Sequence, residues 1–299
     1  MKILVLGCKG QLGRCLEDQL LSTDYKVFFT SREQMDIADF EATKNHIRDI
    51  APDVVINAAA YTAVDKAEED RQTADLINDL AVKNIAGICN QIDCWLIHVS
   101  TDYVFDGTSD VPYKEEDQTN PQGVYGETKL QGELAIQSSG CKHIIIRAAW
   151  VFSEYGNNFL TTMLHLGAEL DELNIVSDQV GCPTYAQDIA EAITAILPQL
   201  QFQKTSGLYH YCGDQPCSWY DFAREIFKQA KTDNIKVPSS IHPIETSAYP
   251  TLATRPAFSV LDCSRIESVF GVNVSDWKRG VKQVVSKKLM ETKLIRNEI

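Results

Sequence analysis

The sequence predicts an α/β fold, with a doubly wound parallel sheet and a smaller C-terminal lobe. Short apolar runs alternate with helical patterns through the first half of the 299 residues, as expected when helices connect parallel strands. The first run, residues 2–6, is almost wholly apolar, which is typical of a strand buried on both faces. A Gly7-x-x-Gly10-x-x-Gly13 turn follows it and opens a helical pattern. These observations predict a Rossmann-type sheet.

The predicted elements follow in regular order. Strands are expected at residues 2–6, 25–30, 54–56, 95–99 and 143–147, and helices at 11–21, 42–50, 74–91 and 125–137. Pro52 ends the connection before the third strand, and Ser100 and Thr101 follow the fourth. Right-handed crossovers bring the carboxyl ends of such strands to one edge, where ligands bind. Residues 1–150 are therefore expected to form an NAD(P)-binding domain.

The strict alternation weakens after residue 150. Shorter pieces are expected at residues 158–170, 188–197, 208–211 and 219–230, and prolines 238, 243, 250 and 256 punctuate a loop-rich region. Residues 151–299 are predicted to be mostly a substrate-binding lobe that closes over the sheet edge. Segments near 178–197 and 206–232 are expected to return to the first domain. The basic stretch 278–296 is expected to be a solvated helix.

Composition excludes several classes of protein. A net charge of −13 argues against nucleic acid as the main partner. No apolar run reaches the roughly 18 residues of a membrane span, and residues 1–7 look like a strand rather than a secretory signal. We therefore expect a cytoplasmic protein without a membrane partner. The nine cysteines have no metal-binding spacing and are expected to be buried small hydrophobes, with no metal site.

The glycine turn predicts a dinucleotide cofactor. Gly7 permits the tight turn, Gly10 allows a pyrophosphate to approach the backbone, and Gly13 lets the helix pack close to the strand. The helix that follows offers free N–H groups and partial positive charge to phosphates.

The end of the second strand favours NADPH, with NADH as the alternative. An acidic residue there would accept a hydrogen bond from the ribose 2′-hydroxyl of NAD, but this chain has Thr30-Ser31-Arg32. The Arg32 guanidinium suits a 2′-phosphate. Asp36 and Ile37 are expected to hold the adenine. Small residues at 57–60, Ala58 among them, would let the backbone after the third strand lie along the cofactor.

Tyr125 and Lys129 supply the predicted chemistry. They are four residues apart, so they share one helix face. A nearby ammonium lowers the pKa of a tyrosine, which is otherwise about 10. Thr101, at the tip of the fourth strand, is expected to donate a second hydrogen bond to the same substrate oxygen. The trio would protonate and stabilise a carbonyl oxygen that receives a hydride.

These motifs resemble those of extended short-chain dehydrogenases/reductases and, among them, the family that reduces dTDP-4-dehydrorhamnose. The matching stretches are residues 7–13 (GCKGQLG), 57–68 (NAAAYTAVDKAE), 100–107 (STDYVFDG), 125–129 (YGETK), 156–159 (GNNF), 178–184 (DQVGCPT) and 255–256 (RP). The likeness covers nearly the whole chain. It implies reduction of the 4-keto group of dTDP-4-dehydro-β-L-rhamnose by NADPH or NADH, for cell-surface polysaccharide synthesis.

The resemblance also assigns residues. Thr101, Tyr125 and Lys129 match the family's catalytic threonine, tyrosine and lysine. Its cofactor contacts match Gln11, Leu12, Asp36, Ile37, Ala60, Tyr61 and Thr62, and its sugar-nucleotide contacts match Thr101, Asp102 and Trp150. Some members dimerise through magnesium held by glutamates, but the corresponding positions here are Cys15 and one near Gln187, which are poor magnesium ligands. We expect a monomer or a homodimer without a metal bridge.

Four alternatives remain open at this stage. Another sugar-nucleotide 4-ketoreductase would present the same three residues to a closely related 4-keto sugar. A sugar-nucleotide dehydratase usually carries Thr-Asp-Glu at the fourth strand tip, whereas this chain has Tyr103 in the third position. An epimerase keeps the tyrosine and lysine, but Arg32 favours a cofactor that leaves after each turnover. A non-catalytic NADP-binding subunit, such as the regulatory partner of methionine adenosyltransferase, shares the fold and some motifs.

Overall fold

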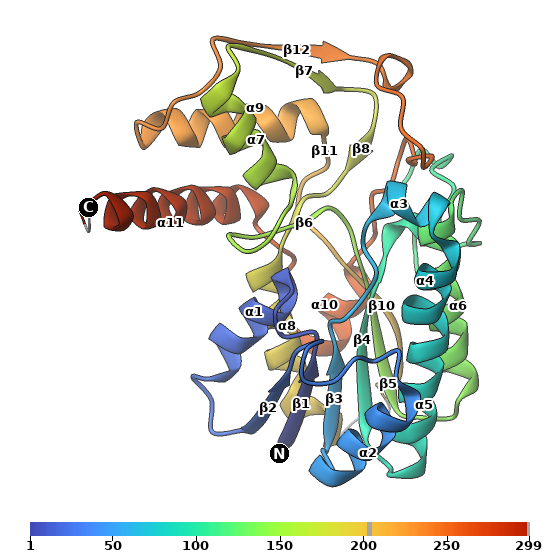
Figure 1. Ribbon diagram of the computed structural model, residues 1–299. Helices are drawn as coiled ribbons and strands as arrows, with labels where there is room; N and C mark the ends of the chain where they lie inside the picture. Colours follow the sequence, from blue (N-terminus) through green and yellow to red (C-terminus); the bar gives the residue numbers. More distant parts are fainter. Residues whose placement is uncertain (202–204, 298–299) are drawn as a thin grey trace.

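A six-stranded parallel sheet forms the centre of the larger lobe (Figure 1). The computed structural model describes residues 1–201 and 205–297. In spatial order the strands are β10 (Gly207–Tyr211), β5 (His143–Ala148), β4 (Trp95–Thr101), β3 (Val54–Asn57), β1 (Lys2–Leu6) and β2 (Lys26–Thr30). Strand β2 pairs with one edge of β1, and strand β3 pairs with the other edge. The predicted parallel sheet is thus confirmed, and its topological switch point lies between β1 and β3.

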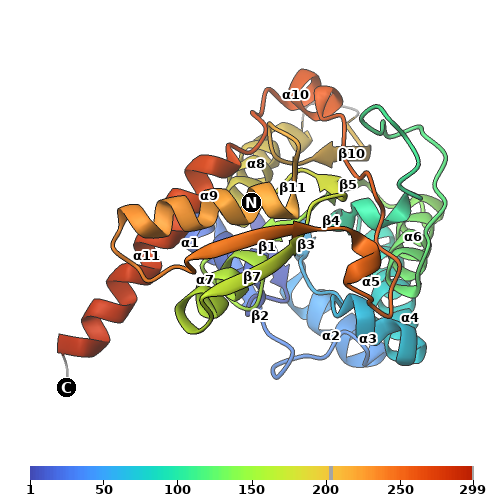
Figure 2. The ribbon, with the colours of Figure 1, turned by 90° about the horizontal axis from the view of Figure 1, so that it is seen from above.

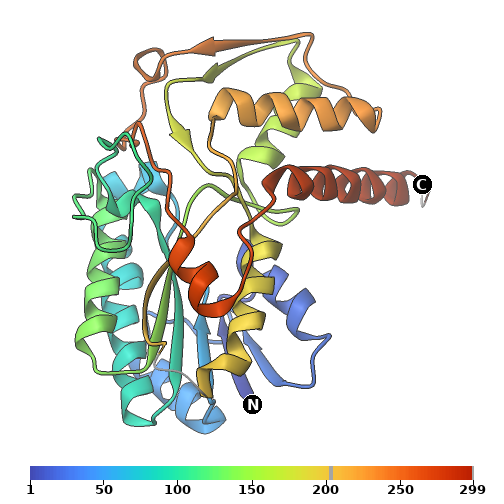
Figure 3. The ribbon, with the colours of Figure 1, turned by 180° about the vertical axis from the view of Figure 1, so that it is seen from behind.

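Helices cover both faces of the sheet (Figure 3). One face carries α1 (Gln11–Leu20), α8 (Ala186–Ile196) and α10 (Ser264–Phe270); the other carries α2 (Phe40–Ile50), α5 (Ala81–Gln91) and α6 (Val124–Ser138). Successive residues of β1 explain this arrangement, because Ile3 packs in the same core as Leu16 whereas Leu4 packs with Ile85. All four are fully buried. Period-2 alternation thus sends apolar side chains to both helical layers.

The helix expected at residues 74–91 is longer and contains a π-helical turn. It runs through α4 (Arg71–Asp75), the turn η1 (Leu76–Leu80) and α5, and α3 (Val64–Glu69) precedes it. Asn78, in the π turn, accepts a hydrogen bond from the Tyr61 backbone N–H (2.9 Å) and donates one to the Tyr61 carbonyl (3.0 Å). It also donates to Thr128 of α6 (3.1 Å). The irregular turn therefore fixes the loop after β3.

The smaller lobe lies above the carboxyl ends of the sheet strands (Figures 1 and 2). It contains α7 (Phe159–Glu169), α9 (Trp219–Thr232), α11 (Trp277–Asn297) and the parallel pair β7 (Glu172–Val176) and β12 (Ser240–Ile244). Short strand pairs join it to the larger lobe: β6 (Val151–Phe152) with β9 (Thr184–Tyr185), and β8 (Val180–Gly181) with β11 (Cys217–Ser218). Short 3₁₀ turns complete the fold: η2 (Asp102–Val104), η3 (Leu197–Gln201) and η4 (Thr246–Ala248).

The later segments divide between the lobes. Helix α8 packs on α1, and β10 pairs with β5, so both lie with the sheet. Helix α9 packs instead against α7 and α11, which corrects the expectation that all of residues 206–232 return to the first domain. The boundary near residue 150 stays a prediction. Among residues 1–201 and 205–297, the structure contains no helix with the length and apolarity of a membrane span.

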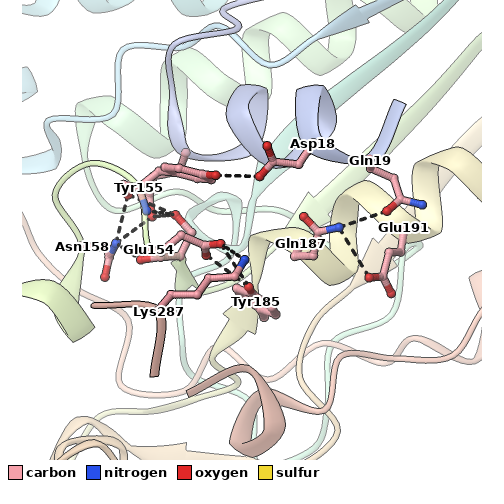
Figure 4. A network of polar contacts seen from close by, with 11 residues as sticks. Asp18, Gln19, Glu154, Tyr155, Asn158, Tyr185, Gln187, Glu191 and Lys287 are labelled. Atoms are coloured by element: carbon pink, nitrogen blue, oxygen red, sulfur yellow. Dashed lines mark hydrogen bonds and ion pairs between the residues drawn. The ribbon is translucent and has the colours of Figure 1, made fainter. Parts of the chain in front are cut away.

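Helix α11 is only partly solvated, contrary to the expectation for residues 278–296. Val281, Val284 and Val285 are fully buried in the core of the smaller lobe. Their i, i+3, i+4 spacing forms an apolar stripe that the many lysines of this segment obscure. On the same helix, Lys287 forms an ion pair with Glu154, whose side chain is 2% exposed (Figure 4).

Candidate active site

The glycine turn forms a cradle that only glycine fits at two positions. Gly7 has a φ of +78°, and a Cβ there would lie 2.7 Å from the Ala59 nitrogen. A Cβ on Gly13 would lie 2.2 Å from the Gly7 carbonyl oxygen. At Gly10 a Cβ would meet only that same oxygen, at 3.4 Å, so space beside the turn remains open. Helix α1 begins directly after Gly10, and none of the described side chains caps its N-terminus. Its free N–H groups suit a phosphate.

A pocket at this turn brings most of the predicted cofactor residues together. It is lined by Gly7, Gly10, Arg32, Asp36, Ile37, Ala58 and Ala60, all predicted from the sequence, and also by Lys9, Glu33 and Met35, which were not predicted. It opens at the carboxyl ends of β1 and β3, the switch point of the sheet. No sequence motif marks Lys9 as a cofactor contact. Only its ion pair with Glu33, just after the second strand, shows that it borders the pocket.

Two exposed ion pairs border the pocket. Arg32 Nε lies 3.0 Å from Asp36 Oδ2, and Lys9 Nζ lies 3.0 Å from Glu33 Oε2. Asp36 also accepts a hydrogen bond from the Ala38 N–H (3.0 Å), so adenine would compete for a carboxylate that already has two partners. Exposed pairs contribute only about 0–1 kcal/mol. A ligand phosphate could therefore replace Asp36 or Glu33 as the partner of the cation at little cost in free energy.

The remaining predicted cofactor residues flank this pocket. Gln11 accepts hydrogen bonds on its side-chain oxygen from Ser153 (3.0 Å) and Asn158 (2.9 Å), both in the loop before α7. Its amide nitrogen is thereby the group available to a ligand. Leu12 packs against the core, Tyr61 is held through its backbone by Asn78, and Thr62 is exposed.

Thr101 and Tyr125 lie together at the carboxyl edge of the sheet, as predicted. Burial raises the pKa of Tyr125 to about 12, a hydrogen bond from Thr101 lowers it in part, and the charge of Asp102 raises it further. Lys129 Nζ donates to the Val99 carbonyl (2.7 Å) and lies 3.2 Å from His98 Nε2. The activation of Tyr125 by the Lys129 ammonium stays a prediction.

Asp102 is a buried carboxyl beside Thr101 and Tyr125. Its Oδ1 accepts a hydrogen bond from Thr101 (3.2 Å), whereas its Oδ2 has no hydrogen-bond partner among the described residues. Burial raises the pKa of Asp102 to about 6, although its contact with Ser259 opposes the shift. An acceptor left open in a buried place is suited to a ligand hydroxyl.

A larger pocket of about 570 Å³ lies between the lobes' facing surfaces. Its apolar floor comes from α7 and β7, while Tyr103, Gln179, Trp219 and Arg255 supply polar and aromatic groups. Arg255 forms a bidentate pair with Asp65 (2.7 and 3.2 Å) and so connects this pocket to α3. Trp150, predicted to touch the sugar, stacks on Trp219 at the pocket's edge. The roles of Arg255 and Trp219 were not predicted.

The positions that correspond to the metal ligands of some relatives do not suit magnesium. Cys15 is fully buried, and burial raises the pKa of its thiol. Gln187 donates hydrogen bonds to Gln19 (3.1 Å) and Glu191 (3.5 Å) (Figure 4). Within the described part of the chain, no group of three or more His, Cys, Asp or Glu side chains is placed to hold a metal ion.

Comparisons with known proteins agree with this arrangement. The family model for the RmlD substrate binding domain matches residues 1–290. A curated dTDP-4-dehydrorhamnose reductase from Sinorhizobium fredii is 40% identical, over 98% of this chain and 99% of that protein. The chain belongs to the dTDP-4-dehydrorhamnose reductase family.

Solved structures of this dTDP-4-dehydrorhamnose reductase family share the fold. The enzyme from Clostridium acetobutylicum is 39% identical with a TM-score of 0.89, covering 96% of this chain and 99% of its own. The enzyme from Bacillus anthracis, solved in complex with NADP, is 31% identical with a TM-score of 0.88 and the same coverage. The full-length match includes both lobes, so the family extends beyond the cofactor-binding half.

Proposed function

We propose that the protein reduces the 4-keto group of dTDP-4-dehydro-β-L-rhamnose to give dTDP-L-rhamnose, with NADPH as the preferred cofactor and NADH as the alternative. The observation that carries this proposal is the position of Thr101 and Tyr125. They lie together at the carboxyl edge of the sheet, the edge at which the cofactor pocket of the glycine turn opens. Tyr103, whose ring centroid is 5.6 Å from that of Tyr125, lines the larger pocket.

The residues of the glycine turn fit the cofactor. The pocket offers the α1 N-terminus to a pyrophosphate and two rim cations, Lys9 and Arg32, to a 2′-phosphate. Bound NADPH supplies the hydride. The relative from Bacillus anthracis was solved with NADP, which supports the same choice here.

The protein's own groups supply the proton and the charge stabilisation. Tyr125 keeps its proton at neutral pH, because burial holds the pKa of its hydroxyl well above 7. It therefore donates to the substrate oxygen as that oxygen gains charge. Thr101 donates a second hydrogen bond, and Lys129, from one helical turn further on, orients the nicotinamide ribose. A buried site strengthens each of these interactions.

The larger pocket is the proposed sugar-nucleotide site. Its apolar floor and Trp219 suit a thymine ring. We assign Trp150, which stacks on Trp219, and Asp102 to the sugar. We further propose two domains that meet near residue 150, a cytoplasmic location, and a monomer or a homodimer without a metal bridge. The net charge of −13 argues against nucleic acid as a partner.

The test is NADPH oxidation with dTDP-4-dehydrorhamnose, made in place from dTDP-glucose by the two preceding enzymes. We expect substrate-dependent loss of NADPH absorbance, with dTDP-rhamnose as the product. NADPH binding without turnover would favour a non-catalytic subunit. Turnover only with another 4-keto sugar nucleotide, or interconversion of two sugars without net NADPH loss, would favour a different ketoreductase or an epimerase.

A further inference from the structure

Asn158 of the smaller lobe reaches back to the first residue of α1. Its Nδ2 donates to the Gln11 side-chain oxygen (2.9 Å), and its Oδ1 accepts from the Thr161 N–H (3.1 Å), which makes it the N-cap of α7. Side chains of α7 line the larger pocket, whereas Gln11 directly follows Gly10, which lines the cofactor pocket. One amide group thus connects the two halves of the candidate active site.

The backbone fixes the direction of both amides. The Thr161 N–H can only donate, so the oxygen of Asn158 must face it and the NH₂ must face Gln11. The Ser153 carbonyl can only accept, and it lies 2.8 Å from the same NH₂. Gln11 must therefore present its oxygen to Asn158, and its own NH₂ is directed elsewhere. This orientation follows from the protein's own contacts, without any ligand.

The loop before α7 holds the Gln11 side chain from more than one side. Ser153 Oγ lies 3.0 Å from the Gln11 oxygen, and a Cβ on Gly156 would lie 3.4 Å from Gln11 Cγ. In the same loop, the Tyr155 hydroxyl donates to Asp18 of α1 (2.6 Å; Figure 4). The loop therefore contacts α1 at two points, which keeps the Gln11 amide in one orientation.

The Gln11 NH₂ lies at a place that favours negative charge. Gln11 is the first residue of α1, and no acidic residue stands in the first turn of that helix. A helix N-terminus carries free N–H groups and partial positive charge. Within the described part of the chain, both hydrogen bonds of the Gln11 side chain use its oxygen. Its NH₂ is therefore a further donor beside the N–H groups of the helix.

We propose that Asn158 is a positioning residue that turns the NH₂ of Gln11 toward the diphosphate of the bound dinucleotide. The smaller lobe, otherwise assigned to the sugar nucleotide, thereby completes the phosphate site of the cofactor. The inference rests on the proposed function for the identity of the ligand. With the amide reversed, Gln11 would place a carbonyl oxygen beside the diphosphate, and the two would repel each other.

Asn158→Asp tests this orientation, because aspartate is an equally good N-cap but its carboxylate can only accept. Gln11 should then turn its NH₂ to the new carboxylate and its oxygen to the diphosphate. We expect the Kd for NADPH, measured by fluorescence titration, to rise about tenfold or more, whereas Gln11→Ala alone should raise it about threefold. The double variant should resemble Gln11→Ala, so that deleting the Gln11 side chain restores affinity in the Asn158→Asp background.

Asn158→Ser is the uncharged control, since serine also caps a helix but offers no NH₂. Its smaller loss of NADPH affinity should also vanish in the Gln11→Ala background, and it decides the question if Asn158→Asp does not fold. Binding of 2′-AMP, which has no diphosphate, should be the same in all variants.

Additive losses at the two positions, or an unchanged Kd for NADPH in Asn158→Asp, would overturn the proposal. Additive losses would mean that the new charge or a displaced loop acts without Gln11. A wild-type protein that binds no NADPH would refute the proposed function and this inference together. The expected pattern of Kd values in a protein that binds NADPH but reduces no sugar nucleotide would support the inference and refute the reductase proposal alone.

Discussion

The Trp150 ring lies flat on the Trp219 ring, with centroids 3.4 Å apart and planes 5° apart. Trp150 also has a φ of +46°, which is uncommon for a bulky residue. Strain of this kind costs roughly 1–3 kcal/mol and persists only where the surroundings enforce it. Here Trp219 encloses one side, and Gly181 of β8 leaves room for the indole on another. The second lobe thus holds in place the residue predicted to contact the sugar.

Gly181→Ala should displace Trp150. A Cβ at this position would lie 2.5 Å from the Trp150 ring and, because the neighbour is a stacked indole, neither group can move freely. We expect KM for the sugar nucleotide to rise at least about tenfold, with KM for NADPH little changed, and the protein to lose about 1–3 kcal/mol of stability. Steady-state kinetics and thermal unfolding measure both effects.

Gly87→Ala is the matched control, because a Cβ there meets nothing within 4 Å and the residue lies in α5. It should raise stability by roughly 0.5–1 kcal/mol and leave both KM values unchanged. An unchanged KM for the sugar nucleotide in Gly181→Ala would mean that Trp150 does not contact the substrate as proposed.

Tyr125→Phe should remove the proton donor and retain the fold. The substitution deletes one hydroxyl from a site where Thr101 and Lys129 are held by other contacts. We expect kcat to fall about 100-fold or more. The Kd for NADPH, measured by fluorescence titration, should change less than about threefold, since the hydroxyl serves chemistry rather than cofactor affinity. A Tyr125→Phe protein with near-normal turnover would end the proposed role of this residue.

The sheet, and the shared helix of Tyr125 and Lys129, could be predicted because both depend on local patterns. Apolar runs and the glycine turn place β1 and α1, and a spacing of four places Tyr125 and Lys129 on one helix. The contacts of Lys129 could not be predicted, because four residues along a helix do not determine where a long flexible side chain points. Its partners, His98 and the Val99 carbonyl, come from another strand.

The second lobe was harder to predict for a similar reason. Strands β7 and β12 are more than 60 residues apart, β7 alternates over only five residues, and Pro243 within β12 is more typical of a loop. The stacking of Trp150 on Trp219 depends on that assembly. Lysines in α11 obscured three buried valines, because a lysine-rich sequence was interpreted by its charge rather than by the spacing of its apolar residues.

Arg32→Ala should weaken NADPH binding more than NADH binding. The guanidinium is exposed and pairs with a surface carboxylate, Asp36, so a 2′-phosphate can recruit it. We expect KM for NADPH to rise about tenfold, which corresponds to about 1.4 kcal/mol, and KM for NADH to change less than about twofold. Lys9→Ala should show the same preference if both rim cations contact the phosphate. Equal losses for the two cofactors would contradict the assignment of Arg32.

Asp102→Asn should stabilise the protein near neutral pH. Burial raises the folded-state pKa of this carboxyl to about 6, above the unfolded value of about 3.9. The ionised form is therefore the disfavoured one. Its cost is absent below about pH 4, grows as pH rises, and is complete above about pH 6, where it amounts to no more than about 3 kcal/mol. The substitution should raise the melting temperature at pH 7.5 and have little effect at pH 4.

Asp106→Asn should change the stability at neutral pH in the opposite direction. Hydrogen bonds from the Thr108 backbone and side chain hold the pKa of the exposed Asp106 carboxyl at about 2. The ionised form is favoured there, so its contribution to stability is present above the unfolded pKa and is lost as pH falls toward 2. Asp106→Asn should therefore lower the melting temperature at pH 7.5, where Asp102→Asn raises it. A stabilisation by Asp102→Asn that is equal at pH 4 and pH 7.5 would show that packing, not the buried charge, is responsible.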